Sequence, residues 1–288
     1  MTGTSQTIRA GRLQVRGLDV ALGTALETGK GGDAGFTAVH QLSIDIPAGQ
    51  FVCILGPSGC GKSTLLGAIA GHLPPAAGEI LLDGVPVRGP APERGLVFQQ
   101  HSLFPWKRVL DNVGFGLKMQ GVPAAERKRE AQALLDLVGL GSFAQRYPAQ
   151  LSGGMQQRVE IARVLINRPR VLLMDEPFGA LDAQTRAHMQ ALLLEVWAQM
   201  RTTVVFVTHD IDEALFLADR VLVMSHRPGR ILEDIPVAFD RPRHADLLTD
   251  DGFIRLKRHC RELLHENYRG GALQGVRDPV PGALATAA

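Results

Sequence analysis

The residues with the most specific chemistry form a glycine-rich loop that ends in a lysine and a serine, Gly56-Pro57-Ser58-Gly59-Cys60-Gly61-Lys62-Ser63. The spacing matches G-x-x-x-x-G-K-[ST], a pattern in which backbone N–H groups surround phosphate oxygens. We expect Lys62 to reach the β- and γ-phosphates of a nucleotide, and the Ser63 hydroxyl to ligate Mg²⁺. This phosphate loop, together with the following Thr64, predicts a binding site for a nucleoside triphosphate.

The flanks of the loop predict the context that the motif requires. The apolar run 51–55 is typical of a buried strand, and residues 64–70 are typical of a helix. A helix that starts near Lys62 adds the positive end of its dipole to the phosphate site. An ordinary glycine-rich turn is the alternative, but the lysine, the serine and both flanks together favour nucleotide binding.

Two adjacent carboxylates follow a second buried strand. The apolar run 171–174 ends in Asp175 and Glu176, which places both at the carboxyl edge of the predicted sheet. Asp175 can hold Mg²⁺ directly or through water, and Glu176 can act as general base toward the attacking water. Adjacent acids can also cap a helix or face a turn. The phosphate loop makes the catalytic interpretation the better one.

Two further polar residues follow strands. His209 comes after the apolar run 204–207, where it can donate to a γ-phosphate or orient the attacking water. Gln99 comes after 96–98, where it can ligate Mg²⁺ or sense the γ-phosphate. Either residue could also be no more than a polar side chain after a strand, but ligands bind at the carboxyl ends of parallel strands.

A second candidate anion site starts a helix elsewhere in the chain. Ser152, Gly153 and Gly154 precede a helical pattern that runs through Arg163. Free N–H groups, the serine hydroxyl and the helix dipole can all bind an anion there. An ordinary helix cap is the alternative.

The order of elements predicts an α/β fold. Strands alternate with helices after residue 165, which favours a mostly parallel sheet covered by helices on both faces. The part before residue 100 is β-rich, and we interpret about 100–165 as an inserted helical subdomain.

Residues 1–35 form a partly flexible segment, with a loop at 29–35. Residues 241–288 form an extension with a basic amphipathic helix, and the end from Gly270 is expected to be disordered. That helix could touch anionic lipid or a partner; we prefer a solvated helical face.

Composition narrows the class of partner. The 288 residues contain 31 Lys and Arg against 29 Asp and Glu, which argues against nucleic acid as the main partner. The three cysteines, Cys53, Cys60 and Cys260, are widely spaced, which favours a reducing compartment. No apolar run is long enough to span a membrane, so we expect a cytosolic protein whose membrane link comes through a partner.

The motifs and their order resemble those of ATP-binding-cassette (ABC) ATPases, a branch of the P-loop NTPases, from about residue 12 to 240. The resemblance rests on the phosphate loop, Gln99, the signature Leu151-Ser152-Gly153-Gly154-Met155-Gln156, the strand 171–176, Ala180-Leu181-Asp182 and His209. It implies a head-to-tail homodimer, with each ATP and its Mg²⁺ between one phosphate loop and the partner's signature. It also implies that Asp182 communicates across the dimer and that Gln99 couples the site to the helical subdomain. Transmembrane permease subunits are expected to dock on that subdomain.

Within this family the chain is most similar to importers of taurine, aliphatic sulfonates and nitrate, with the taurine branch first. The similarity lies in residues 89–99, 103–106, 111–117 and 227–231. It implies a peripheral position on the cytoplasmic face of the inner membrane and indirect work with a periplasmic solute-binding protein. The alternatives are an importer of nitrate or another small anion, a soluble ABC ATPase acting on DNA or ribosomes, and a module that holds nucleotide without turnover. Long coiled coils or tandem cassettes, typical of the soluble class, are not visible, and the intact Glu176 and His209 argue against the last.

Two positions in the site depart from the family or stand out. The family stacks an aromatic residue on adenine where this chain has Leu22, and we expect Phe36 to substitute. Stacking on a base contributes about 1–3 kcal/mol. Cys60 lies near a helix N-terminus, which can lower the pKa of a thiol and make it reactive. The alternative is that Cys60 is only a small residue that fits the loop.

Overall fold

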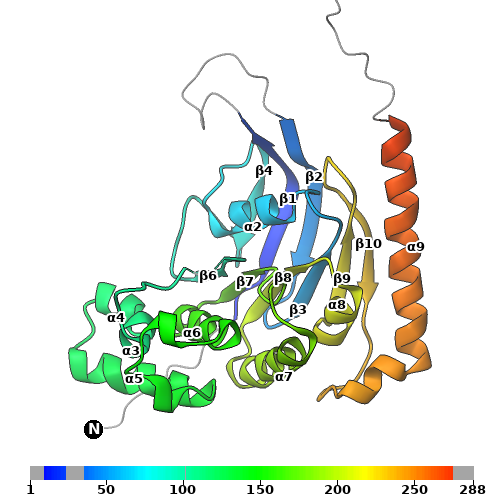
Figure 1. The fold of residues 1–288 in the computed structure, drawn as a ribbon. Helices are drawn as coiled ribbons and strands as arrows, with labels where there is room; N and C mark the ends of the chain where they lie inside the picture. Colours follow the sequence, from blue (N-terminus) through cyan, green and yellow to red (C-terminus); the bar gives the residue numbers. More distant parts are fainter. Residues whose placement is uncertain (1–9, 24–35, 101, 275–288) are drawn as a thin grey trace, which may run out of the picture.

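The computed structural model describes residues 10–23, 36–100 and 102–274, with side chains as far as Asn267. Two sheets form the framework of the molecule (Figure 1). The predicted loop at 29–35 and the chain from 275 lie outside the described residues.

The larger sheet carries the predicted site. Its order is β10-β9-β3-β8-β7-β6, and every neighbouring pair is parallel except β10 with β9. The strands are β3 (Phe51–Leu55), β6 (Arg94–Val97), β7 (Val171–Asp175), β8 (Thr203–Thr208), β9 (Arg220–Met224) and β10 (Ile231–Pro236). The central β3 leads into the phosphate loop, so the mostly parallel sheet predicted from the sequence is confirmed.

The smaller sheet is antiparallel, in the order β2-β1-β4-β5. Its strands are β1 (Leu13–Leu22), β2 (Phe36–Ile46), β4 (Ala77–Leu82) and β5 (Val85–Pro86). Within β1 the sequence contains two short stretches of alternating apolar and polar residues, 13–15 and 18–20. The structure joins them through a register shift between Val15 and Leu18, where Gly17 has a φ of 54°. Glycine adopts this left-handed conformation without steric cost, so the strand continues past the interruption.

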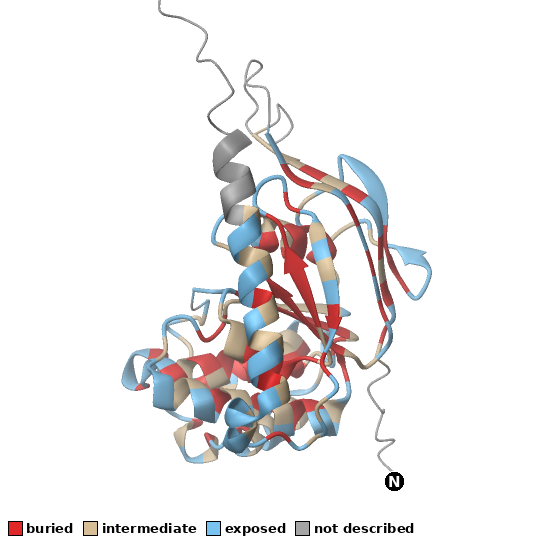
Figure 2. Cartoon of the chain, turned by 90° about the vertical axis from the view of Figure 1, so that its right-hand side faces the viewer, coloured by how far each residue is buried: buried red, intermediate tan, exposed pale blue. Residues whose placement is uncertain are grey.

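Helices cover both faces of the larger sheet. Along β3, Val52 and Ile54 face α2 (Lys62–Ala70) and the smaller sheet, while Phe51, Cys53 and Leu55 face the other helices. Those helices are α6 (Gly153–Leu165), α7 (Ala183–Met200), α8 (Ile211–Leu217) and α9 (Asp251–Gln274). Figure 2 shows the buried strands between the layers. The continuous apolar runs in the sequence reflect strands that are covered on both faces.

The elements described between β6 and β7 are all helical. They are α3 (Val109–Val113), α4 (Phe115–Met119), α5 (Ala124–Leu137), the short 3-10 turns Gly141–Phe143 and Pro148–Gln150, and α6. Figure 1 shows this group beside the larger sheet. In the described part of the chain, no helix is both long and apolar enough to pass through a membrane.

The C-terminal helix α9 continues to Gln274, so the prediction of disorder from Gly270 is wrong at its start. A 3-10 turn, Ala245–Thr249, precedes it. Phe253 and Cys260 are buried against the core, while Arg255, Arg258 and Arg261 are exposed. These arginines therefore lie on the exposed face of an amphipathic helix.

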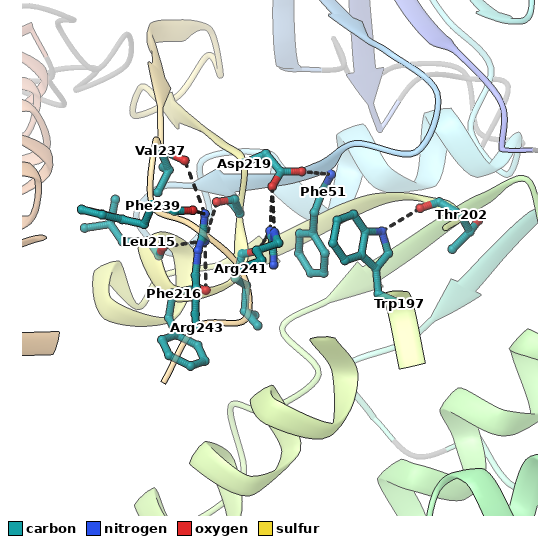
Figure 3. A network of polar contacts seen from close by, with 12 residues as sticks. Phe51, Trp197, Thr202, Leu215, Phe216, Asp219, Val237, Phe239, Arg241 and Arg243 are labelled. Atoms are coloured by element: carbon teal, nitrogen blue, oxygen red, sulfur yellow. Dashed lines mark hydrogen bonds and ion pairs between the residues drawn. The ribbon is translucent and has the colours of Figure 1, made fainter. Parts of the chain in front are cut away.

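Two arginines of the segment before α9, Arg241 and Arg243, bind this segment to the C-terminal end of α8 (Figure 3). Arg243 is buried and donates to the carbonyl oxygens of Leu215, Phe216, Ala218, Val237 and Phe239. Arg241 bonds Asp219, and its guanidinium lies 4.5 Å from the Trp197 ring centroid. Burial lowers the pKa of Arg243 to about 10, so it stays charged at neutral pH. Its fork of donors satisfies the carbonyls that end α8.

Replacing Arg243 by Met should lower the free energy of unfolding by roughly 2–4 kcal/mol, because several buried carbonyl groups lose their donor. Urea denaturation measures the effect. Arg255→Met on the exposed face of α9 is the matched control and should change stability by less than about 0.5 kcal/mol. Equal losses in the two variants would show that the carbonyl contacts of Arg243 add nothing.

Candidate nucleotide site

The phosphate loop joins β3 to α2, as predicted, and presents the start of α2 to the solvent-accessible site. Gly61, the N-cap of α2, has a φ of 104°, and a Cβ there would lie 2.7 Å from the carbonyl oxygen of Ala38. No side chain caps this helix, so its first N–H groups can bind an anion. Lys62 is buried, and its Nζ donates to the carbonyl oxygens of Gly56 and Pro57, each at 2.9 Å. The backbone of the phosphate loop therefore fixes the position of the Lys62 ammonium group.

Two of the three predicted Mg²⁺ ligands, Ser63 and Asp175, are in direct contact. The Ser63 hydroxyl donates to Asp175 Oδ1 at 3.1 Å, although the two residues belong to α2 and β7. Burial raises the pKa of the Asp175 carboxyl, and the hydrogen bond from Ser63 opposes that shift. A hydroxyl and a carboxylate at this separation fit Mg²⁺, which binds oxygen ligands and keeps several waters or phosphate oxygens.

Glu176 lies between the two other predicted catalytic residues. Its Oε2 is 2.9 Å from His209 Nδ1, and its Oε1 is 3.5 Å from Lys62 Nζ. The residue has a φ of 42°, an unusual value for a side chain other than glycine. Such backbone strain is concentrated at functional sites. The neighbouring strands β7 and β8 thus bring Glu176 and His209 into direct contact.

A cavity of about 250 Å³ opens beside these groups. Its lining includes much of the predicted set: Phe36, Ser58, Gly59, Gly61, Lys62, Ser63, Thr64, Gln99 and Glu176. Gln99 is exposed and lines this cavity, in the stretch between β6 and the first helix that follows it, α3. Nine of the predicted residues therefore line one cavity, while Asp175 and His209 are not among its lining residues.

Phe36 lies across from Leu22. The two are paired residues of β1 and β2, and both line the cavity. Phe36 is the strand partner of Leu22, the position where ABC ATPases have an aromatic residue. Its phenyl ring can therefore take the place of that aromatic residue. The ring is 46% exposed, which leaves it accessible to a base.

Three residues that line the cavity, Leu22, Ala38 and Arg227, were not predicted as site residues. Arg227 lies in the segment between β9 and β10, more than 160 residues after the phosphate loop in sequence. A signal was present, because 227–231 is one of the segments that resemble the sulfonate and nitrate importers. Resemblance did not indicate that this segment reaches the phosphate loop.

The expectation of a low thiol pKa at Cys60 is wrong. The side chain is buried, and burial raises its pKa even though Lys62 acts in the opposite direction. A helix N-terminus lowers a thiol pKa only where the thiolate stays solvated. The structure favours the other interpretation, a small residue that fits inside the loop.

The signature residues start α6 at some distance from this cavity. Ser152 is the N-cap, and its hydroxyl accepts from Met155 N at 3.4 Å. Ser152 and Gly153 are exposed, and the described lining of the cavity includes none of residues 152–154. Asp182 caps α7 in the same way, and the bond from Thr185 N lowers the pKa of its carboxyl. Within one chain, the two predicted anion sites are separate.

A phosphate loop after the central strand β3, with a histidine after the adjacent strand β8 and a carboxylate pair at the end of β7, the next strand along, defines a P-loop NTPase of the ATP-binding-cassette type. Residues 39–179 match the ABC transporter family. The chain is 51% identical over 243 residues to a taurine import ATP-binding protein of Rhizobium johnstonii, covering 82% of this chain and 92% of that protein. It belongs to the ATP-binding subunits of ABC transporters.

Solved structures give the same result for the fold. A dimeric post-hydrolysis state of the ATP-binding cassette MJ0796, bound to ADP and phosphate, has a TM-score of 0.67 at 32% identity. It covers 79% of this chain and all of that one. The cassette cbiO1 of Clostridium perfringens, part of the transporter complex cbiONQ, has a TM-score of 0.69 at 27% identity, over 91% and 98% of the two chains.

Proposed function

We propose that this chain is the ATP-hydrolysing subunit of an importer for taurine or a related sulfonate. The main support for ATP hydrolysis is the position of Glu176, which lies between Lys62 and His209. The pair of Ser63 and Asp175 lies next to it. Little covalent chemistry is needed in phosphoryl transfer, so a base, a cation and a metal site at one cavity supply the required parts. The solute rests on similarity to taurine import proteins.

In this proposal the site works as follows. Ser63, Asp175 and Gln99 would hold Mg²⁺, which would supply charge neutralisation for the phosphates. Lys62 and the N–H groups of α2 bind the β- and γ-phosphates. Glu176 takes a proton from the attacking water, and His209 orients Glu176 through its ring nitrogen.

Two copies complete the site. We propose that residues 152–154 of one cassette close over the phosphate loop of the other, since the described cavity of one chain excludes them. The dimeric state of the cassette MJ0796 supports the association of two copies. The helical segment at about 100–165 is proposed to receive the permease subunits on the cytoplasmic face of the inner membrane. A periplasmic solute-binding protein takes part only indirectly.

Uptake measurements test the solute. Deletion of the gene in its native host should reduce uptake of labelled taurine at least about tenfold if this chain supplies the energy for import. The wild-type gene should restore uptake, and the Glu176→Gln variant should not. Loss of nitrate uptake with taurine uptake retained would identify the alternative importer. Normal uptake of both solutes would reject the proposal.

A further inference from the structure

The segment 225–230, between β9 and β10, lies directly against the nucleotide cavity. Its Gly229 N–H donates to the carbonyl oxygen of Ala38 at 2.9 Å, and the Gly229 carbonyl accepts from His40 N at 3.0 Å. These bonds tie the segment to the beginning of β2, which carries Phe36. A strand-like pair of bonds fixes the separation between the two backbones.

The same segment also packs against the phosphate loop. A Cβ at Gly229 would lie 2.5 Å from the carbonyl oxygen of Cys60, so only glycine allows this approach. The Ser225 hydroxyl donates to the carbonyl oxygen of Pro228 and accepts from Arg230 N, each at 2.9 Å. The segment is therefore fixed by its own hydrogen bonds and by contacts to two parts of the site.

Arg227 is the side chain that this segment presents to the cavity. Its Nε donates to the carbonyl oxygen of Gly59 in the phosphate loop. Its guanidinium carbon lies 5.0 Å from the centroid of the Phe36 ring. A cation at this distance over an aromatic face is attracted by the quadrupole of the ring. Arg227 therefore connects Phe36 to the phosphate loop through one side chain.

We propose that Arg227 positions the Phe36 ring as the platform on which the nucleotide base stacks. The guanidinium holds the ring beside the phosphate loop, and the exposed part of the ring is left for the base. An arginine suits this task because its planar group can face a ring while Nε donates elsewhere, and a lysine lacks that geometry. The inference rests on the nucleotide site proposed above and adds a residue that sets affinity on its base side.

The competing explanation is that Arg227 acts on the phosphates, because it also contacts Gly59. Inorganic tripolyphosphate separates the two explanations, since it has the phosphates but no base. A positioning role predicts that Arg227→Ala weakens MgATP binding and leaves magnesium tripolyphosphate binding unchanged. A role toward the phosphates predicts that both ligands are weakened.

The experiment measures dissociation constants for MgATP, MgGTP and magnesium tripolyphosphate by titration calorimetry. Phe36→Ala and Arg227→Ala should each weaken MgATP binding about 5- to 150-fold, the range expected for loss of one stacked base. The double variant should bind MgATP as tightly as the weaker-binding of the two single variants, because each substitution alone removes the same stacking contact. Arg227→Lys should recover only part of the loss. Arg230→Ala, which removes an exposed charge from the same segment, is the matched control and should bind like the wild type.

The inference is overturned if Arg227→Ala binds MgATP as the wild type does, if tripolyphosphate loses as much affinity as MgATP, or if the two single losses add. Unchanged binding of both ATP and GTP by Phe36→Ala removes the stacking role of the ring itself. A wild-type protein that fails to bind MgATP contradicts the proposed function instead, so the two failures are distinguishable.

Discussion

Glu176→Gln should lower the rate of ATP hydrolysis at least about 100-fold, the size expected for loss of a general base. The amide keeps the shape of the side chain and can still bond to His209, but it cannot accept a proton from water. Affinity for MgATP should stay within about threefold, because the phosphate loop and the pair Ser63 and Asp175 are untouched. Phosphate release measures the rate, and nucleotide titration measures the affinity.

An exposed glutamate provides the matched control for this result. Glu195→Gln on α7 makes the same chemical change away from the cavity and should hydrolyse ATP at the wild-type rate. Wild-type hydrolysis by Glu176→Gln would reject Glu176 as the base. His209 would then be the next residue to consider, since it lies at hydrogen-bonding distance from the same carboxylate.

Ser152→Arg should abolish hydrolysis while leaving MgATP binding by the monomer largely intact. The new side chain places bulk and positive charge where the partner cassette's nucleotide is proposed to lie. The local cost is small, because the lost cap to Met155 N contributes about 1 kcal/mol. In a Glu176→Gln background, MgATP should produce dimers by sedimentation, and adding Ser152→Arg should leave monomers.

Ala125→Arg adds the same side chain to an exposed position on α5 and should dimerise and hydrolyse normally. If Ser152→Arg instead loses nucleotide binding as a monomer, residues 152–154 belong to the site of their own chain. Normal hydrolysis by the variant would remove the signature from the proposed mechanism.

The phosphate side of the site was predictable because its signals are local. Each functional residue directly follows an apolar run, and the carboxyl ends of parallel strands meet at one edge of a sheet. Asp175, Glu176 and His209 could therefore be placed near Lys62 before any contact was known. The helix Ala183–Met200 can likewise be recognised in the sequence, because its apolar positions repeat at helical spacing.

The base side was less predictable because it depends on contacts between distant segments. The approach of Arg227 to Phe36 requires the whole sheet, since β9 lies next to β3 only through a crossover. The environment of Cys60 was misjudged for a related reason. Its position next to a helix start is visible in the sequence, but its burial beneath Gly229 and Met224 depends on chain far away. The Arg227–Phe36 contact and the burial of Cys60 both depend on packing between distant segments. The periodicity of apolar residues along the sequence does not show such packing.

Helix α8 begins two residues after His209, and chain from beyond residue 240 contacts both of its ends. Lys257 of α9 forms an ion pair of 2.7 Å with Asp212 in the first turn of α8. Arg241 and Arg243 bind carbonyl groups at the other end. Force applied to α9, from a fused domain, a surface tether or a neighbouring subunit, therefore reaches the helix next to His209. Fluorescent labels or immobilisation tags attached through a short linker to α9 should be expected to disturb turnover, whereas the exposed turn at β5 offers an attachment point on the opposite sheet.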